Sequence, residues 1–349
     1  PLYSLETRHP VSEFDLLGIS VPYEQLYTNT LHLLELAGIP LRSAQRLDSE
    51  YPLVLAGGHA AYNPEPMADF IDIFLIGEGE EAIVEIASKI RQWRIKAGNT
   101  KRSRQVIAAS RLELLRELAT MDGVYVPQFY SVDYLDDGTI AQVRPMEDVA
   151  LFPVLKRIVK QLPPPLTKFV VPFADVVHNR AAIEIMRGCT RGCRFCHAGM
   201  VTRPVRERSV GEIVSAVGDM VKFSGYEELA LLSLSSSDYR DISRLVETIS
   251  AEFGDLNLNI SLPSLRIETV SVDLMDRLMA AGRRGGFTLA PEAASERMRK
   301  IINKPVSTKQ LLETAREIYS RGWKTIKLYF MIGHPAETLD DVQDIADLA

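Results

Sequence analysis

The three cysteines of this 349-residue chain, Cys189, Cys193 and Cys196, all lie in one short segment. They are spaced C-x3-C-x2-C, and the sequence contains no fourth thiol. An iron-sulfur cube that only carries electrons takes four thiolates, so a cube on three thiolates leaves one iron open to another ligand. A ligand with an amine and a carboxylate, such as the methionine end of S-adenosylmethionine, can chelate that iron and be cleaved when the cluster delivers one electron. The spacing therefore predicts a reactive 4Fe-4S cluster.

Other uses of these cysteines stay open. The odd cysteine count and the absence of an apolar export segment argue against disulfides. A zinc site of the three thiolates and His197 is chemically possible, although structural zinc usually draws on two ligand pairs separated by a loop. It would make the chain a zinc or redox-sensing module without enzymatic activity. Chance spacing of three buried cysteines is the remaining alternative.

The cysteine segment resembles the signature of the radical S-adenosylmethionine (SAM) superfamily, in which an aromatic residue precedes the last cysteine. Phe195 fills that place. The resemblance implies iron binding by the three cysteines, SAM as the cofactor, and reductive cleavage to a 5′-deoxyadenosyl radical that abstracts hydrogen from the substrate. It further implies an electron donor such as flavodoxin or ferredoxin as a partner.

Strands alternate with helices along the chain, which predicts an α/β fold with parallel sheets. Two series are separable. The first has predicted strands over 14–21, 52–58 and 71–76. The second has predicted strands over 182–186, 229–234, 258–262, 286–289 and 325–331. The cysteine segment directly follows the first strand of the second series, at the strand end where barrel active sites gather.

We therefore predict a truncated doubly wound, Rossmann-like domain over 1–92 and a partial (β/α)6 TIM-like barrel, the radical SAM core, over 181–349. Residues 93–180 form an extension and linker, with a predicted hairpin over 125–144 around Asp136-Asp137-Gly138. The chain begins at Pro1 and stops inside a predicted helix. We expect a fragment that lacks the first part of one domain and the last part of the other.

Glycines end two strands of the first series, as Gly57-Gly58 and as Gly77 before Glu78. Open α/β sheets bind ligands at these strand ends, where glycine lets the backbone approach a cofactor. A tight strand-to-helix turn needs glycine without any ligand, so a purely structural role is equally open.

Residues 10–92 resemble the later half of the cobalamin (B12)-binding domain that precedes many radical SAM enzymes, through these glycines and Asn63-Pro64-Glu65-Pro66. The resemblance implies cobalamin as a further cofactor. It implies contacts from Ser20, Gly57, Gly58, Gly77 and Glu78. The family loop whose histidine can ligate cobalt is not in this chain, and the family's Ser-x-Leu stands here as Ser20-Val21-Pro22.

The superfamily resemblance also assigns SAM contacts at the strand ends of the second series. Ser235 and Ser236 stand where many members carry Gly-Gly-Glu for the methionine amino group, and Arg266 could meet the methionine carboxylate. A solvated arginine is the alternative there. Glu292 would contact the ribose and Gly333 the adenine, with Phe195 alongside.

A basic stretch follows the cysteines and includes Arg203, Arg206 and Arg208. It is either a solvated charge run or an electropositive rim for an anionic substrate. Taken with the cysteine motif, the stretch most resembles an uncharacterised bacterial group of cobalamin-domain radical SAM proteins. The substrate is unknown.

The formal net charge of -6 argues against broad binding to nucleic acid. No membrane partner is expected, because no run reaches the length of a membrane span, and reduced thiols suit a cytoplasmic protein. Modification of an unknown substrate, methylation if cobalamin is bound, is the predicted catalytic activity. A methylthiotransferase acting on RNA or a ribosomal protein is the alternative enzyme, but it would need a second cluster for which no cysteines remain.

Overall fold

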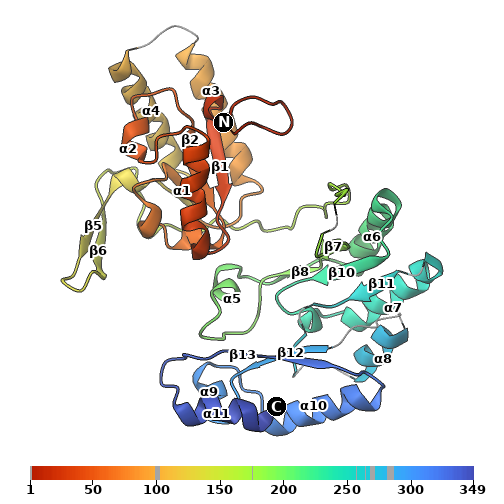
Figure 1. Ribbon diagram of the computed structural model, residues 1–349. Coiled ribbons are helices and arrows are strands. Elements are labelled where there is room, and N and C mark those ends of the chain that lie inside the picture. The colour runs from red at the N-terminus through yellow and green to blue at the C-terminus, as the bar shows by residue number, and fades with distance from the viewer. Residues whose placement is uncertain are drawn as a thin grey trace. The chain divides into compact units, whose positions relative to one another are not determined.

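The computed structural model describes residues 2–98, 103–174, 176–256, 258–263, 265–267, 272–280 and 287–349. The chain divides into two compact units, Pro1–Lys160 and Gln161–Ala349. Both units are mixed α/β, as the alternating pattern predicts (Figure 1). Gly286, the first residue of one predicted strand, lies outside the described residues.

The first unit is built on a four-stranded sheet in the order β1-β2-β3-β4. Its strands are β1 (Leu16–Ser20), β2 (Leu53–Gly57), β3 (Ile73–Leu75) and β4 (Val124–Tyr125). The first three run parallel, and β4 is antiparallel to β3. Central strands β2 and β3 are buried apolar runs, whereas β1 is half-exposed because it lies at the edge of the sheet. The prediction of a buried strand over 14–21 was therefore wrong in burial and length.

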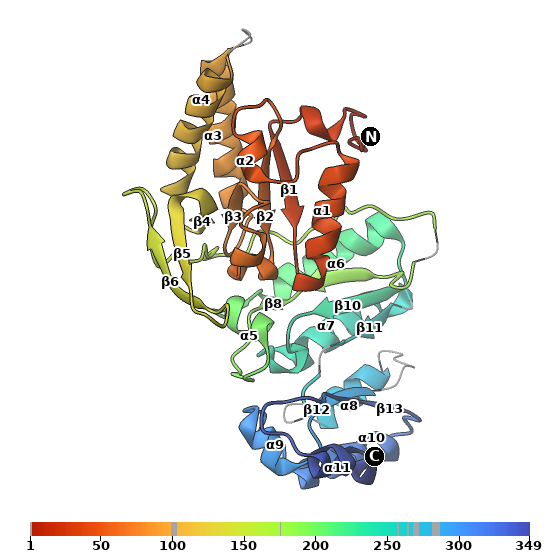
Figure 2. The same ribbon diagram turned by 60° about the vertical axis from the view of Figure 1, so that its left-hand side comes forward.

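Helices cover both faces of this sheet, as expected for a doubly wound fold. They are α1 (Tyr27–Leu36), α2 (Ser43–Arg46), α3 (Ala82–Ala97) and α4 (Arg104–Ala119). Helix α1 lies on one face, and α3 and α4 lie on the other (Figure 2). Leu34, Ile86 and Leu118 are fully buried in the shared core.

The predicted hairpin is present but shorter than expected. It consists of β5 (Tyr130–Tyr134) and β6 (Ile140–Pro145), and its turn holds Gly138 at φ +82°. The Asp137 carboxylate accepts bonds from the amide and hydroxyl of Thr139. Tyr125 belongs instead to β4, because its backbone pairs with Phe74 in the main sheet.

The second unit carries a parallel sheet in the order β11-β10-β7 and a separate parallel pair, β12 and β13. A short antiparallel ladder, β8 with β9, follows β7. The strands are β7 (Ala181–Glu184), β8 (Met186–Arg187), β9 (Arg206–Glu207), β10 (Glu228–Leu232), β11 (Asn259–Ser261), β12 (Phe287–Glu292) and β13 (Ile326–Phe330). The predicted strand over 182–186 is thus split in two.

Helices alternate with these strands, as βα units require. They are α5 (His197–Val201), α6 (Val210–Ser224), α7 (Ile242–Phe253), α8 (Val272–Ala280), α9 (Glu296–Ile301), α10 (Thr308–Ser320) and α11 (Leu339–Leu348). Serine hydroxyls cap α6 and α10, where Ser209 and Ser307 accept bonds from first-turn amides. In the part of the chain that is described, no helix combines the length and apolarity needed to cross a bilayer.

Candidate functional site

The cysteine loop is closed at its base by the β8–β9 ladder. Met186 pairs with Glu207 and Arg187 with Arg206, so the intervening residues form one loop. Gly188 begins it at φ +92°, where a Cβ would lie 2.7 Å from the carbonyl oxygen of Pro204. Only glycine fits this crossing.

The three thiols are half-buried and free. The Cys189 Sγ accepts a bond from the Arg191 amide at 3.4 Å, and the Cys196 Sγ accepts one from the Gly199 amide at 3.3 Å. Amide donors aimed at cysteine sulfur make the kind of bond that tunes the potential of iron-sulfur clusters. The cysteine loop therefore fits a 4Fe-4S cluster.

A zinc site would need its ligand atoms closer together than a 4Fe-4S cluster does. Four ligands of one zinc ion must converge on a single centre, whereas each thiolate of a cube binds a different iron. Among the described residues, no three Cys, His, Asp or Glu side chains are placed to hold one metal ion. In this arrangement, Cys189, Cys193, Cys196 and His197 are not placed around one common centre.

The cysteine loop is fastened to the segment after β12. The Asn303 side-chain amide donates to the Gly192 carbonyl at 2.8 Å, and the Arg194 amide donates to the Ile302 carbonyl at 2.9 Å. Phe195 packs against the small buried cluster of Ala293, Met298 and Ile302. The residue before the last cysteine thus holds the loop against the end of β12.

The end of β10 brings Ser235, Ser236 and Asp238 into a buried turn. The Ser236 hydroxyl donates to the Leu231 carbonyl at 3.0 Å, so it serves the fold of the turn. The Ser235 hydroxyl is buried and has no hydrogen-bond partner among the described residues. A buried hydroxyl without a partner is costly, so Ser235 is available to a polar ligand.

Asp238 lies between two arginines from different elements. Its Oδ2 is 3.7 Å from the Nε of Arg191, in the cysteine loop, and 3.7 Å from the Nε of Arg266, beyond β11. This oxygen is buried and accepts no hydrogen bond within the described residues. The carboxylate is held by charge at distances too long for hydrogen bonding. An ammonium group could bind Asp238, and a carboxylate could bind the guanidinium groups beside it.

Glu292 ends β12 in the left-handed region, at φ +68°. Its carboxylate pairs with Lys304 at 3.1 Å, and its carbonyl accepts the Met331 amide at 2.8 Å. The residue joins the ends of β12 and β13. Glu292 thus lies at the expected strand end, with its side chain already in an ion pair.

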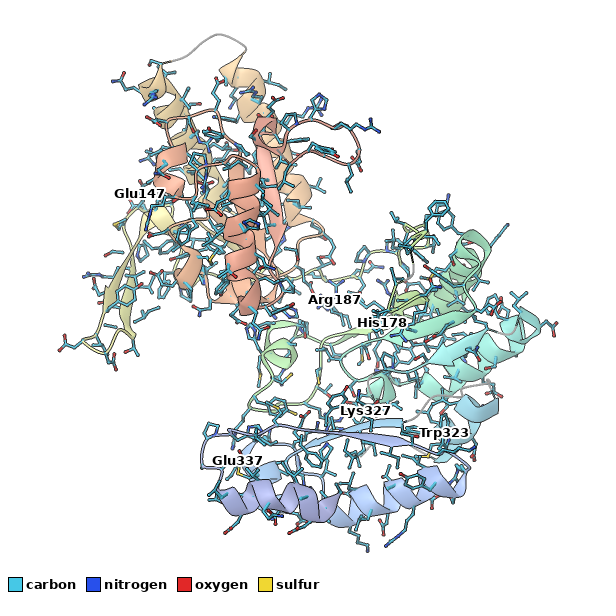
Figure 3. All side chains as sticks on the ribbon, viewed as in Figure 1. Glu147, His178, Arg187, Trp323, Lys327 and Glu337 are labelled. Atoms are coloured by element: carbon cyan, nitrogen blue, oxygen red, sulfur yellow. The ribbon has the colours of Figure 1, made fainter. Side chains whose placement is uncertain are left out.

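The turn between β13 and α11 contains Gly333, at φ +89°, and His334. The Glu337 carboxylate, labelled in Figure 3, accepts the amides of both residues. The centroids of the His334 and Phe195 rings are 6.0 Å apart, and the His334 Nε2 is buried with no hydrogen-bond partner in the described part of the chain. The turn and the cysteine loop are therefore neighbours.

The basic stretch is only partly exposed, because Arg203 is exposed, Arg206 is half-buried and Arg208 is buried. The Arg208 side chain is 4% exposed and pairs with Glu212 at 2.6 Å, while its Nε donates to the Glu184 carbonyl at 2.9 Å. Arg203 donates to the Arg191 carbonyl, and Arg206 donates to the Pro204 carbonyl. The hypothesis that Arg208 attracts substrate was wrong, because this arginine is buried in ion pairs.

In the first unit, two of the glycines predicted to contact cobalamin are needed for close backbone packing. A Cβ on Gly58, at φ +100°, would lie 2.7 Å from the Val21 carbonyl oxygen. A Cβ on Gly77, at φ +112°, would lie 2.2 Å from the Arg157 carbonyl oxygen. Glu78 accepts the Val159 amide at 2.6 Å. These three residues hold neighbouring segments together.

The other two predicted cofactor contacts remain open at the sheet edge. Ser20 and Gly57 pair with each other at the carboxyl ends of β1 and β2. A Cβ on Gly57 would make only an ordinary contact, 3.9 Å from the Leu75 carbonyl oxygen. A ligand at this edge would meet Ser20 and Gly57.

Two family models match the chain, one for each unit. The model described as "Radical SAM proteins, N-terminal" matches residues 1–127, and the model described as "Radical SAM superfamily" matches residues 183–349. Together they match most of the chain, with part of each unit and the whole cysteine loop. The chain belongs to the radical SAM superfamily.

Curated relatives extend this assignment. "Uncharacterized protein MJ0966" of Methanocaldococcus jannaschii is 26% identical over 349 residues, which cover 99% of this chain and 65% of that protein. "Ribosomal protein uS12 methylthiotransferase RimO" of Methylococcus capsulatus is 25% identical over 205 residues, 50% of this chain and 45% of that protein. This radical SAM chain therefore spans less than two thirds of these relatives.

Solved radical SAM structures share the fold. The methyltransferase TsrM of Kitasatospora setae, determined with cobalamin and a 4Fe-4S cluster, matches with a TM-score of 0.63 and 15% identity, over 95% of this chain and 61% of that one. The cobalamin-dependent radical SAM enzyme OxsB matches with a TM-score of 0.60 and 15% identity, over 96% of this chain and 43% of that one. Both support a Rossmann-like unit followed by a radical SAM unit.

Sequence reasoning missed the residues that hold the radical SAM loops in place. Asp341, on α11, pairs with Arg297 and accepts the hydroxyls of Ser295 and Thr338. The Arg297 guanidinium, followed by those hydroxyls, holds the pKa of the Asp341 carboxyl far below its usual range. The Thr338 capping box was the local signal for this aspartate. Its partners on α9 are distant in sequence and gave no signal.

Proposed function

We propose that this chain is a radical SAM enzyme that binds a 4Fe-4S cluster through Cys189, Cys193 and Cys196. The cluster, when bound, supplies the electron that cleaves SAM to a 5′-deoxyadenosyl radical, which abstracts hydrogen from the substrate. The electron would come from a donor such as flavodoxin or ferredoxin. The chain covers 65% of its Methanocaldococcus jannaschii relative, so what we say about the substrate is also a proposal.

The observation that carries this proposal is the convergence on the cysteine loop of segments that are far apart in sequence. Arg191 of the loop lies beside Asp238, and Phe195 lies beside the end of β12 and His334. Ser235 and Asp238 offer buried polar atoms without hydrogen-bond partners among the described residues. An amino-acid group would therefore have an acceptor in Asp238 and a donor in Arg266, beside the cysteine loop that would hold the cluster.

We expect Asp238→Asn to weaken SAM binding about ten- to hundredfold while leaving iron and sulfide content unchanged. A hydrogen bond between charged groups contributes about 1.5–3 kcal/mol, and the amide removes the charge that attracts the ammonium group. Titration calorimetry of the anaerobically reconstituted protein measures the affinity.

Asp241→Asn is the matched control for Asp238→Asn, because Asp241 is exposed three residues further along the chain. We expect that variant to bind SAM normally. If Asp238→Asn also bound SAM normally, Asp238 would not receive the amino group.

We propose that the first unit binds cobalamin at the carboxyl edge of β1 and β2. The likeness in fold to two enzymes solved with cobalamin supports this. We assign Ser20 and Gly57 as the contacts. The other predicted contacts, Gly58, Gly77 and Glu78, already pack against or bind other backbone segments of the first unit. When bound, cobalamin would supply a methyl group, so methylation is the reaction we favour.

Gly57→Val tests the cobalamin site at a position where an added Cβ meets no atom closer than 3.9 Å. We expect at least a tenfold loss of cobalamin affinity, since the branched side chain would occupy the ligand's space. Corrinoid absorbance after reconstitution and desalting measures it. Gly18→Val, on β1 two residues before Ser20, is the control and should retain cobalamin, as its Cβ is also 3.9 Å from its nearest neighbour. Equal retention by both variants would make Gly57 a structural residue only.

The methylthiotransferase relatives favour a second candidate for the barrel unit. That reaction would need a sulfur-donating second cluster, and the sequence has only three cysteines. Mass spectrometry of the modified substrate distinguishes the two reactions, because methylthio transfer adds a sulfur atom and methylation does not.

We also propose that the substrate is anionic. The argument rests on Lys327 of β13 and not on the basic stretch after the cysteines. Ile326 and Leu328 of β13 pack toward the helices. Lys327 lies between them in the strand, so its side chain is on the opposite face of the β12–β13 sheet (Figure 3). Its Nζ is 5.0 Å from the Tyr329 ring centroid, and it has no carboxylate partner among the described residues. A cation on this face of the partial barrel favours a substrate with a carboxylate or phosphate group.

A further inference from the structure

A buried charge cluster in the first unit is separate from every strand-end residue discussed above. It contains two arginines, Arg46 of α2 and Arg111 of α4, and one carboxylate, Asp72, just before β3. Arg46 is 0% exposed, Arg111 is 3% exposed and Asp72 is 9% exposed. The cluster therefore carries one more positive than negative charge inside the protein.

Arg46 pairs with one oxygen of the single carboxylate. Its Nε and Nη2 both donate to Asp72 Oδ2, at 3.2 Å and 2.9 Å. The same oxygen accepts the Val54 amide at 2.7 Å. The remaining donors of Arg46 reach the carbonyls of Pro40, Leu41 and Phe70. Arg46 and Asp72 thus form a buried ion pair, in which the bonds from Arg46 and Val54 all meet the carboxylate at its Oδ2.

Arg111 is left without such a partner. Its Nη1 donates to the Tyr51 carbonyl at 2.7 Å, but its Nε and Nη2 are buried and have no hydrogen-bond partner among the described residues. Burial lowers the pKa of Arg111, and the Asp72 charge opposes this. A guanidinium keeps its proton in proteins, so an uncompensated one in the interior is strongly unfavourable.

A cavity lies against this guanidinium group. Its volume is about 20 Å³, and its lining includes Arg111, Asp72, Ser43 and Gln128, with leucine and isoleucine side chains elsewhere. A cavity needs about 10–15 Å³ to hold one water-sized occupant. Gln128 is exposed, so it marks the side on which the cavity meets solvent. The space suits one small polar species, such as a single ion or a single water molecule.

The carboxylates on the outer side of Arg111 do not neutralise it. Asp15 and Glu50 line a neighbouring small cavity with Arg111, but neither carboxylate lies within 4 Å of its guanidinium group. Asp15 instead pairs with Arg94, at 3.4 Å. The excess positive charge of the cluster therefore remains at the cavity.

We propose that this cavity binds one small monovalent anion of the size of chloride. The anion accepts bonds from Arg111 Nε and Nη2 and balances the charge of the Arg46–Asp72–Arg111 cluster. It ties α4 to the chain around Tyr51 and to β2, and so stabilises the first unit independently of any iron or SAM chemistry. Water in the same place would satisfy the hydrogen bonds but leave the charge uncompensated.

Hydrogen exchange of the full chain in sodium chloride and in sodium gluconate, at equal ionic strength and pH, tests the proposal. Gluconate is too large for the cavity. Because a ligand of the native state stabilises it by mass action, chloride at ten times its dissociation constant should slow exchange through global opening of the first unit about tenfold. The amides of β2 and α4 report this. Bromide soaked into crystals should give an anomalous peak beside Arg111.

Arg111→Met should abolish the difference between the two salts. Arg116→Met is the matched control on the same helix, because Arg116 is exposed and pairs with Glu147; it should keep the difference. Gln128→Glu should also abolish it by placing a negative charge at the mouth of the cavity, and this exposed substitution keeps the core intact. It therefore tests the site even if Arg111→Met fails to fold. Equal exchange in chloride and gluconate, or absence of the bromide peak, would show that the cavity binds no halide and would overturn the proposal.

Discussion

Replacing Cys189, Cys193 or Cys196 by alanine is expected to remove the iron-sulfur cluster and to reduce 5′-deoxyadenosine formation below detection. The chain has three cysteines in total, so two thiolates would remain and no other thiol could substitute. Iron and sulfide analysis with the ultraviolet-visible spectrum of anaerobically purified protein measures the cluster. Chromatography of the reaction mixture measures the nucleoside.

His197→Ala is the control that separates a cluster from zinc. His197 was the fourth ligand of the zinc hypothesis, and a cluster on three cysteines does not need it. We expect this variant to keep about four iron and four sulfide per chain, the composition of a 4Fe-4S cluster. A cysteine variant with full cluster content would exclude that cysteine as a ligand. Stoichiometric zinc, lost on His197→Ala, would replace the enzyme proposal with the zinc module.

Gly77→Ala is expected to destabilise the first unit by about 3 kcal/mol or more, because it combines backbone strain with a clash in a packed region. Gly77 has φ +112°, and its Cβ would lie 2.2 Å from the Arg157 carbonyl oxygen and 2.5 Å from the Arg157 amide nitrogen. Backbone pairing between Gly77 and Arg157 joins β3 to the chain that follows the hairpin. Urea unfolding with and without Gly77→Ala in a Trp323→Phe background, where Trp93 is the remaining tryptophan, measures the loss of stability by fluorescence.

Gly79→Ala is the matched control in the same turn. Its nearest neighbour is a leucine side chain at 3.6 Å, an ordinary contact, so we expect stability to change little. The pair distinguishes a structural glycine from a ligand-contacting one. Unchanged stability of Gly77→Ala would contradict the close packing against Arg157 and would return Gly77 to the cobalamin contacts.

Local patterns in the sequence were sufficient to predict the cysteine motif and the succession of parallel strands. Thiol spacing is a property of one loop, and buried parallel strands appear as short apolar runs between turn residues. Leu53 to Gly57 is such a run, and it forms the buried strand β2. The radical SAM assignment, and the expectation of a Rossmann-like unit before it, depended on this local information.

Only the tertiary structure decided which polar and glycine residues serve the fold and which face a ligand. Arg208 belonged to a basic stretch in the sequence, yet Glu184 and Glu212 enclose it. In the sequence, Gly58 and Gly77 resemble the glycines of a ligand-binding loop. In the structure, other backbone segments fill the space beside them. Asp238 meets Arg191 and Arg266 only after the strands assemble. The physical reason is that burial and charge pairing depend on residues distant in sequence, whereas a one-dimensional pattern records only neighbours along the chain.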